Sequence, residues 1–278
     1  MTQLAGVREL IVPKHFLFGL PWLGAAILFL HCSFSEFLIA LVAFSALRLA
    51  GMVWNGIADR AFDAKNPRTS ARPLARGSID LRTGRLLLCA LFALFFLSAA
   101  LFGIAIFMLS LPVAGLVGAY SYTKRFSWGC HAVLGLIYLL VPPLTEFVFF
   151  GTISGSSLLL GVASGASISG NDILYSIQDM EFDRRAKLKS VPARFGAARS
   201  ERAAAILQGV TILFLLAFGS LAHLSIIFFL AVASLGILYS VSWKRAITYE
   251  QAFRFFNMAT GWIICAGILG DRIWRAMW

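Results

Sequence analysis

The sequence predicts an all-α integral membrane protein, a bundle of nine transmembrane helices around a central cavity. Three observations support this fold class. Of the 278 residues, 59% are hydrophobic and only 13% are charged, and the mean hydropathy is +0.82. Apolar runs recur along the whole chain, and several reach the roughly 20 residues that a helix needs to cross a bilayer. The basic residues gather in alternate loops, as they do in the cytoplasmic loops of membrane proteins.

Each apolar run is expected to form one span of a single transmembrane domain, residues 1–278. The runs on either side of Gly103 are short, so we expect a tight turn at this glycine. The nine expected spans are 15–32, 36–58, 85–102, 104–122, 131–150, 157–180, 201–220, 223–242 and 255–274.

The distribution of charge predicts how the chain is oriented in the membrane. Lys and Arg follow the second, fourth, sixth and eighth spans, whereas the loops after the first, third, fifth and seventh spans contain none. The positive-inside rule therefore places the basic loops and the N-terminus in the cytoplasm. The expected location is the inner (cytoplasmic) membrane of a bacterium, with the site facing the cytoplasm. Arg272 and Arg275 break the rule, because an odd number of spans puts them outside. Topology accounts for much of the net charge of +11, so we expect the lipid bilayer as surroundings, no nucleic acid and no obligate protein partner.

The first candidate site lies where the second span meets its basic loop. Asn55, Asp59 and Asp63 follow one another at intervals of four residues, which places them on one helix face. Arg48, seven residues before Asn55, shares this face. Two carboxylates one turn apart repel each other, and near the membrane they also cost desolvation energy. A magnesium ion removes both costs, since it prefers hard oxygen ligands and commonly binds one or two carboxylates together with phosphates.

The second candidate site repeats the pattern where the sixth span meets its loop. Tyr175, Asp179 and Asp183 have the same spacing, and Asp172 extends the polar face towards the membrane. Because the two sites lie four spans apart, we expect two similar halves, roughly 15–125 and 131–245, plus a last helix. The acidic helix ends would then face each other across the central cavity. The alternative is that these acids only form salt bridges with loop arginines at the helix ends.

Basic residues near these acids are candidates for binding a diphosphate, whose charge Arg and Lys usually neutralise. Each loop base can equally be a solvated topology signal, but Arg48 lies inside a span, where a charge is expected to be functional or paired. A transporter that uses the intramembrane acids as an ion path is the alternative class. The candidate diphosphate- or substrate-binding residues are Arg48, Arg68, Arg72, Lys124, Tyr175 and Lys189.

Two long runs resemble the signatures of the UbiA superfamily of membrane prenyltransferases. The run from Asn55 to Gly77 reads NGIADRAFDAKNPRTSARPLARG, and the run from Tyr175 to Gly196 reads YSIQDMEFDRRAKLKSVPARFG. Residues 16–21 and 120–125 are also similar to the family. The two long runs occur in the family's order and make the resemblance specific over most of the chain.

The resemblance implies a nine-helix bundle whose cavity opens to the cytoplasm and to lipid. It also implies transfer of a polyprenyl group from polyprenyl diphosphate to an aromatic acid, of the 4-hydroxybenzoate or dihydroxynaphthoate type, in ubiquinone or menaquinone biosynthesis. By motif position, Asp59, Asp63, Asp179 and Asp183 would be catalytic and, with Asn55, would hold Mg²⁺ and the diphosphate. The bases would contact the diphosphate or the carboxylate of the acceptor.

This sequence departs from the family at two positions. The sequence Asp179-Met-Glu-Phe-Asp183 is more similar to that of the menaquinone branch, whose acceptor is a dihydroxynaphthoate, than to that of 4-hydroxybenzoate enzymes. Lys187 stands where family members usually carry glycine, which puts the local loop geometry in question. A family member with another acceptor or donor is also compatible with the motifs.

Other polar and aromatic residues have two interpretations. Glu146, in the fifth span after two prolines, can select the acceptor or take the leaving proton, or it can bind a backbone group freed by the prolines. Aromatic rings stabilise cations, so Tyr120, Tyr122, Tyr175 and Trp54 are candidates for lining a pocket around an allylic cation. Each can also be an ordinary packing or interfacial residue.

Overall fold

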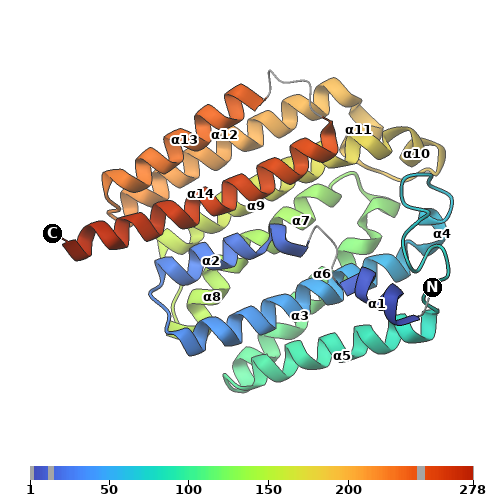
Figure 1. Cartoon of the computed structure of the whole chain (residues 1–278), viewed down its shortest axis with the longest axis horizontal. Coiled ribbons are helices and arrows are strands. Elements are labelled where there is room, and N and C mark those ends of the chain that lie inside the picture. Colours follow the sequence, from blue (N-terminus) through green and yellow to red (C-terminus); the bar gives the residue numbers. More distant parts are fainter. Residues whose placement is uncertain (1–2, 12–15, 243–247, 278) are drawn as a thin grey trace.

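The computed structural model describes residues 3–11, 16–242 and 248–277, and all regular structure in these ranges is helical. The long helices lie roughly alongside one another in one bundle (Figure 1). The α-helices are α1 (Gln3–Ile11), α2 (Leu20–Phe29), α3 (Phe34–Ala58), α4 (Arg60–Asp63), α5 (Leu81–Ala100), α6 (Ile104–Phe126), α7 (Cys130–Leu139), α8 (Val141–Phe150), α9 (Gly155–Ser176), α10 (Met180–Arg185), α11 (Val191–Phe195), α12 (Ala197–Leu221), α13 (Ile226–Ser242) and α14 (Tyr249–Met277). Two short 3₁₀ turns, η1 (Phe16–Phe18) and η2 (Ile177–Asp179), complete the set.

Six of the nine expected spans are long and apolar enough to cross a membrane. They are α3, α5, α6, the α7–α8 pair, α12 and α14. The molecule is therefore an integral membrane protein, although the count of nine spans is not confirmed by these criteria. The three remaining segments are α2, α9 and α13, and each of them is shorter or more polar than a typical span.

The first and eighth expected spans are shorter than predicted. α2 has 10 residues and α13 has 17, so at 1.5 Å per residue α2 is only about 15 Å long, half the thickness of the hydrocarbon core. Most of α2 is buried against other helices, in particular α14, α8 and α3. Its apolar sequence therefore reflects burial in the protein, which a hydropathy pattern does not distinguish from exposure to lipid.

α9 is polar for a membrane helix, and its burial explains why. This helix carries many Gly and Ser residues, yet 16 of its 22 residues are buried, because it lies at the centre of the bundle between α7, α12 and α14. A central helix does not face lipid, and small residues allow its neighbours to approach closely. α9 is thus the helix around which the second half of the chain packs.

Two prolines interrupt the fifth expected span. The helix from Cys130 divides into α7 and α8 at Leu140, two residues before Pro142. A proline inside a helix removes a hydrogen-bond donor and its ring crowds the preceding turn. The residues around the break, including Leu140 and Val141, line the interior cavity described below.

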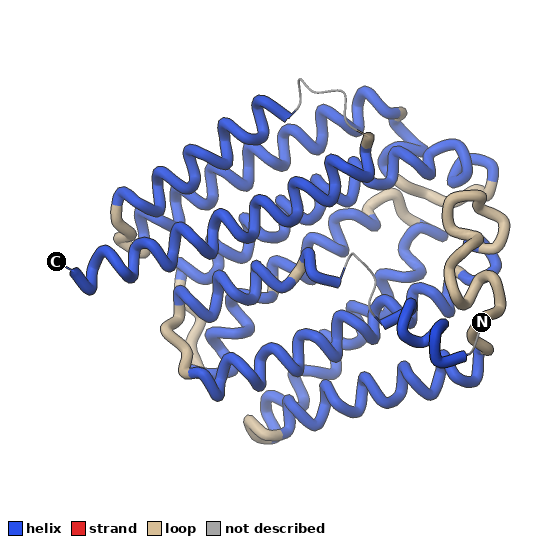
Figure 2. The backbone as a smooth tube through the Cα atoms, viewed as in Figure 1, coloured by secondary structure: helices blue, strands red, loops and turns tan. Residues whose placement is uncertain are grey.

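The two ends of the bundle differ in their connections. The loop after α4 and the short helices α10 and α11 lie at one end, which also holds α1, while α14 ends at the other (Figure 1). The connections at the end where α14 finishes are short turns, and the longest loop lies at the opposite end (Figure 2). We call the end with α4, α10 and α11 the polar end, since both acidic motifs and their basic loops lie there.

Glycine residues let α7 and α9 approach each other. A Cβ atom on Gly165 would lie 2.6 Å from the carbonyl oxygen of Gly135, and one on Gly161 would lie 2.4 Å from the carbonyl oxygen of Leu139. Real Cβ atoms do not come this close to backbone oxygen, so the two helices would have to separate. The spacing Gly161-x-x-x-Gly165 is the small-residue pattern by which membrane helices pack closely.

Replacing Gly165 by alanine is therefore expected to destabilise the protein. The new methyl group meets backbone, which cannot rotate away, and overpacking of this kind costs about 1–3 kcal/mol. Gly209 in α12 is a matched control, because a Cβ there meets nothing within 4 Å and alanine favours a helix. Thermal unfolding in detergent should show a lower transition temperature for Gly165→Ala and an unchanged or higher one for Gly209→Ala. Equal stability of the two variants would contradict this account of the α7–α9 contact.

Candidate active site

The first acidic motif lies at a break in a helix. α3 ends at Ala58, Asp59 adopts φ −96° and ψ 6°, and the chain then continues as the short helix α4. Asn55, in the last turn of α3, donates a hydrogen bond from Nδ2 to Oδ2 of Asp59 at 2.9 Å. Asp63 lies at the end of α4 and is 7% exposed. The expected i, i+4, i+8 face is thus bent at its middle residue.

The second acidic motif repeats this local geometry. Asp179 ends the turn η2 with φ −96° and ψ 0°, and α10 follows directly. Asp183 in α10 is 2% exposed, as deeply buried as a core residue. The first and second aspartates of each motif therefore have corresponding places, one at a helix break and one buried in the short helix beyond it. The division of the whole chain into two similar halves stays a prediction.

Each of the four carboxylates has a basic partner. Such pairing was the alternative to a metal site, and for the described residues it is observed. The Asp63 carboxylate accepts two hydrogen bonds from Nη1 of Arg72, at 2.9 and 3.1 Å. The other pairs are Asp59 with Arg125 at 3.5 Å, Asp183 with Lys124 at 3.7 Å, and Asp179 with Arg68.

The loop after the first motif binds directly to the second motif. Asn66 donates from Nδ2 to Oδ1 of Asp179 at 2.9 Å, and Nε of Arg68 donates to the same oxygen at 2.8 Å. Nη1 of Arg68 donates to the Tyr175 hydroxyl at 2.7 Å. The two motifs, more than 100 residues apart in the chain, therefore meet at the polar end.

Asn66 is a site residue that the spacing argument did not single out. It follows Asp63 by three residues, so it does not continue the i, i+4 pattern. Its burial, 7% exposed, is the signal that matters, because a buried amide needs a polar partner. Ser190 is similar: it is fully buried and its hydroxyl donates to Asp183 at 2.8 Å.

The pKa values of Asp59 and Asp179, the first aspartates of the two motifs, shift in opposite directions. Burial raises the pKa of Asp59 above its ordinary value, the nearby Asp63 charge raises it further, and Lys124 and Arg125 offset these effects only in part. Burial alone would also raise the pKa of Asp179, but its hydrogen bonds and ion pair with Arg68, helped by Asn66, outweigh burial and lower it. Asp59 is thus the carboxylate whose negative charge is less well compensated.

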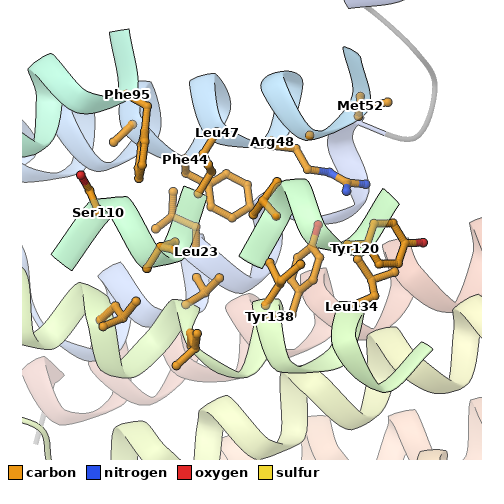
Figure 3. Close-up of a pocket in the computed structure, with 18 of the residues that line it drawn as sticks. Leu23, Phe44, Leu47, Arg48, Met52, Phe95, Ser110, Tyr120, Leu134 and Tyr138 are labelled. Atoms are coloured by element: carbon orange, nitrogen blue, oxygen red, sulfur yellow. The ribbon is translucent and has the colours of Figure 1, made fainter. Parts of the chain in front are cut away.

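An apolar cavity of about 460 Å³ reaches from the polar end into the bundle. Its lining on α6 extends from Tyr120 to Ile106, which at 1.5 Å per residue is about 21 Å. Figure 3 shows Arg48, Tyr120 and Tyr138 towards one end of the cavity and Phe95 and Ser110 towards the other. Away from the end with Arg48, Tyr120 and Tyr138, the cavity is lined almost entirely by aliphatic and aromatic side chains.

Five of the predicted site residues line this cavity, and the others lie around its polar end or outside it. Arg48 is close to Tyr138, with the guanidinium carbon 5.8 Å from the ring centre. Lys189 lies beside Lys124, whose carbonyl oxygen accepts from the Lys189 N–H at 2.6 Å, but its Nζ donates to the carbonyl oxygen of Phe126 at 3.0 Å. The predicted residues that line the cavity are Arg48, Asn55, Asp63, Arg72 and Tyr175; those that do not are Asp59, Arg68, Lys124, Asp179, Asp183 and Lys189.

The aromatic candidates divide in the same way. Tyr120 and Tyr175 line the cavity, as expected. Trp54 and Tyr122 do not: the indole of Trp54 donates to the Tyr122 hydroxyl at 3.2 Å, and its ring packs against Phe92 of α5. Tyr138, which the sequence did not single out, is 3% exposed and lines the cavity opposite Arg48.

Glu146 is a structural residue far from the acidic motifs. Its Oε2 accepts hydrogen bonds from the backbone N–H of Ser154 at 2.8 Å and from the Ser154 hydroxyl at 2.9 Å. Ser154 is the N-cap of α9, whereas the acidic site lies beyond the other end of that helix. Glu146 thus binds a backbone group, but at the start of α9 and not one freed by the prolines. It is not among the residues that line the cavity.

Lys187 occupies a position that favours glycine. It has φ +57°, and it ends α10 with the two hydrogen bonds of a Schellman motif, from Lys187 N to Arg184 O and from Leu188 N to Asp183 O. A side chain in this left-handed region costs about 1 kcal/mol or more. The loop that follows Asp183 thus keeps the geometry of a glycine although the sequence has a lysine.

Replacing Lys187 by glycine is expected to stabilise the protein by up to about 1 kcal/mol, since the strain at a positive φ is removed. Lys65, an exposed residue near the end of α4 that does not have a positive φ, is a suitable control. Lys65→Gly should give no stabilisation in the same thermal unfolding measurement. A lower transition temperature for Lys187→Gly would show that the side chain itself contributes more than the backbone strain costs.

The donor atoms at the polar end suit a magnesium ion, but they do not form a preformed cage. Among the residues that the structure describes, no three His, Cys, Asp or Glu side chains lie close enough together to hold one ion. Magnesium does not require such a cage, because it usually binds one or two carboxylates and takes its other ligands from phosphates and water. The buried carboxylates of Asp63 and Asp183 and the amide oxygens nearby are hard ligands of the required kind.

The fold and this site define an integral membrane protein whose interior apolar cavity ends in a cluster of paired acids and bases. The chain belongs to the UbiA prenyltransferase family, whose model matches residues 17–264. It is therefore an enzyme, a membrane prenyltransferase, and the transporter alternative is set aside.

Named relatives and solved structures agree with this assignment. The chain is 31% identical over 238 residues to a 4-hydroxybenzoate octaprenyltransferase from Pseudomonas aeruginosa (strain UCBPP-PA14), covering 84% of this chain and 80% of the relative. It is similar to the apo structure of a UbiA homolog from Aeropyrum pernix K1, with TM-score 0.81, 28% identity, and 94% and 99% of the two chains covered. A UbiA homolog from Archaeoglobus fulgidus bound to GPP and Mg²⁺ has the same fold, with TM-score 0.74, 19% identity, and 96% and 99% covered.

Proposed function

We propose that this enzyme transfers a polyprenyl group from a polyprenyl diphosphate to an aromatic acid, as a step in making a respiratory quinone. The observation that carries the proposal is the shape and polarity of the cavity: about 460 Å³, apolar along its length and charged at one end. A polyprenyl diphosphate has the same division into a hydrocarbon tail and an anionic head. Each buried CH₂ group of the tail contributes about 0.8 kcal/mol, so the apolar walls bind it without specific contacts.

The anionic head of this substrate would lie among the bases at the polar end. Arg72 lines the cavity, and Arg68 and Lys124 lie next to the second motif. In the free protein these bases neutralise Asp63, Asp179 and Asp183, so they are already positioned when a diphosphate arrives. Lys189 would join them only by giving up its hydrogen bond to Phe126.

The acids and Asn55 are the residues that would hold a divalent cation together with the diphosphate. A UbiA homolog with the same fold is described as bound to GPP and Mg²⁺, which supports magnesium here. Bound Mg²⁺ would neutralise charge on the leaving diphosphate. The chain's own contribution is a dry cavity that excludes water from the allylic carbon and aromatic rings, Tyr120 and Tyr175, that face it.

Arg48 is the residue proposed to bind the carboxylate of the acceptor. It lies in α3 deeper than the two motifs, and it faces the cavity beside Tyr138. The similarity to a Pseudomonas 4-hydroxybenzoate octaprenyltransferase supports 4-hydroxybenzoate as the acceptor. The sequence from Asp179 to Asp183 favours a dihydroxynaphthoate instead. The bacterial cytoplasmic membrane, with the site facing the cytoplasm, is the proposed location, because basic loops surround the polar end.

Two assays run side by side would test the function and choose between the acceptors. Purified protein in detergent would be given a polyprenyl diphosphate and Mg²⁺ with either 4-hydroxybenzoate or 1,4-dihydroxy-6-naphthoate. We expect release of diphosphate and a prenylated product that depend on both the cation and one of the acids. Arg48→Gln should raise the KM for the acceptor more than the KM for the prenyl diphosphate. Diphosphate release that is independent of every aromatic acid would contradict the proposal.

A further inference from the structure

A surface groove of about 440 Å³ lies between α7 and α12, apart from the interior cavity. Both helices pack on α9, and the small residues Ala132 and Ala203 line the space between them. Residues of α9 form the floor of this groove. Leu136, one turn after Ala132, and Ile206, one turn after Ala203, are exposed large apolar side chains. In a membrane protein such side chains face lipid, so the groove opens to the bilayer.

The groove starts at the polar end and extends into the membrane. Its lining on α12 runs from Arg199 to Leu207, which at 1.5 Å per residue is about 12 Å. One leaflet contributes half of the hydrocarbon core, roughly 15 Å. Apart from His131, Ser169 and Arg199, the residues that line the groove are apolar. The groove therefore has the depth and polarity that suit an acyl chain of one leaflet.

Two arginines lie at the polar end of the groove. Arg199 lines it from the first turn of α12, and the guanidinium carbon of Arg194 lies 5.6 Å from the centre of the Trp128 ring. Trp128 and Phe195 both line this end, with their rings packed edge to face at 5.5 Å. Tryptophan is typical of the boundary between membrane and water. This end of the groove therefore presents positive charge at the level of lipid head groups.

Neither arginine is paired with an acid among the residues that the structure describes. The nearest acids in the sequence have other partners: Asp183 pairs with Lys124, and Glu201 accepts a hydrogen bond from the Tyr249 hydroxyl. α12 also begins here, and its N-cap, Gly196, has no side chain to bind the first turn, so the helix N-terminus favours an anion as well. The charge at this end is therefore complementary to a phosphate group.

We propose that the groove binds one anionic phospholipid of the surrounding membrane. The lipid phosphate lies between Arg194 and Arg199, and one acyl chain lies between α7 and α12. Basic pockets between transmembrane helices bind such head groups, because each base near the membrane surface attracts an anionic lipid. A zwitterionic lipid has the same chains without the net charge, so the head group decides which lipid binds. This inference does not depend on the proposed function.

The groove and the interior cavity share a wall. His131 lines the groove, and its Nδ1 lies 2.6 Å from Oδ2 of Asp172, which lines the cavity. The backbone N–H of Val191, another residue of the groove, donates to Nε2 of His131 at 3.4 Å. Val191 follows Ser190, whose hydroxyl donates to Asp183. A lipid in the groove would therefore also hold in place the segment that supports the second acidic motif.

Thermal unfolding of the purified protein in detergent tests the proposal without any substrate. Phosphatidylglycerol should raise the transition temperature by roughly 2–5 °C, because a ligand that binds only the folded state stabilises it. Phosphatidylcholine with the same chains, and inorganic phosphate, should each leave it unchanged. Native mass spectrometry should show one retained phosphatidylglycerol per chain.

Two double variants separate the site from a general effect of surface charge. Arg194→Gln with Arg199→Gln should lower the affinity for phosphatidylglycerol about 30-fold, the effect of two bases at a membrane surface, and abolish the thermal shift. Arg82→Gln with Arg85→Gln is the matched control, since these arginines are also exposed and lie in the first two turns of α5 but line neither the groove nor the cavity. The control should keep the full shift. All four side chains are exposed, so both variants are expected to fold.

A second pair of variants tests the acyl chain. Ala203→Phe fills the groove and should also abolish the shift, whereas Ala205→Phe, at an exposed position of α12 outside the groove, should keep it. Hydrogen exchange provides the location, because phosphatidylglycerol should slow exchange in residues 190–200 of the wild type and not in Arg194→Gln with Arg199→Gln.

Three results would overturn the proposal. An equal loss of the shift in the two arginine variants would mean that only overall charge matters. An equal shift with phosphatidylcholine or with inorganic phosphate would mean that the groove does not select an anionic lipid. If phosphatidylglycerol gives no shift while a polyprenyl diphosphate gives one that requires Arg194 and Arg199, the groove binds a second prenyl substrate instead.

Discussion

Asp179→Ala and Asp59→Ala are each expected to lower turnover by about 10²–10³-fold or more, the loss that follows removal of one preorganised charge from an active site. Asp179 is the residue to which the first motif's loop binds, through Asn66 and Arg68. Its removal leaves Arg68 without its carboxylate partner and also removes a proposed cation ligand. Asp59 is the acid whose charge is less compensated, so a cation has most to stabilise there.

Glu181 provides the matched control for this experiment. It lies between Asp179 and Asp183 in the same segment, but its side chain is 62% exposed and forms an ion pair with Arg184, three residues further along. Glu181→Ala should keep near wild-type activity. Diphosphate release and product formation would be measured for all three variants, after size-exclusion chromatography shows that each is folded in detergent. Near-normal turnover in either aspartate variant would contradict the assigned site.

Removal of divalent cations is expected to abolish turnover completely, and added Mg²⁺ should restore it. The structure adds a more specific expectation about binding. Because each of the four carboxylates has an arginine or lysine partner in the free protein, Mg²⁺ alone must compete with those partners. A diphosphate attracts the same bases and supplies phosphate oxygens, so the cation and the diphosphate should bind together far better than either does alone.

Thermal unfolding of the cation-free protein provides a readout that does not depend on turnover. Ligands that bind only the folded state raise the transition temperature. Mg²⁺ with inorganic pyrophosphate should raise it clearly, and each alone should raise it little. The joint effect should vanish in Asp59→Ala and Asp179→Ala but persist in Glu181→Ala. A full shift with Mg²⁺ alone would mean that the four ion pairs do not compete with the metal.

Much of the fold was predictable because lipid imposes a simple rule on sequence. Long apolar runs correctly indicated α3, α5, α6, α12 and α14, and the all-helical membrane class. Two of the predicted spans, α2 and α9, do not meet the length and hydropathy criteria, for opposite reasons. α2 is apolar but only 10 residues long, and α9 is polar for a membrane helix because it is buried among other helices. Hydropathy measures apolarity, and it does not tell whether the apolar neighbour is lipid or protein.

The candidate site was predictable where chemistry requires a repeated spacing. Two carboxylates at i and i+4 are costly at a membrane surface, so the positions of Asp59, Asp63, Asp179 and Asp183 were informative. Asn66, Ser190 and Tyr138 are uncharged, so their positions in the sequence did not indicate a site. Their roles become visible only from their burial in the structure. His131 is the plainest example, since an isolated histidine near a helix end has many uses until its neighbour Asp172 is known.

The spacing along single helices was therefore sufficient for the membrane class, for the two acidic motifs and for the resemblance to the family. The pairing of acids with bases, the cavity and the His131–Asp172 contact depend on which faces of separate helices meet. The reason is geometric: local sequence sets the direction of a side chain relative to its own helix, whereas contacts between helices depend on packing. Here that packing includes the close glycine contact of α7 and α9, the two helices that carry His131 and Asp172.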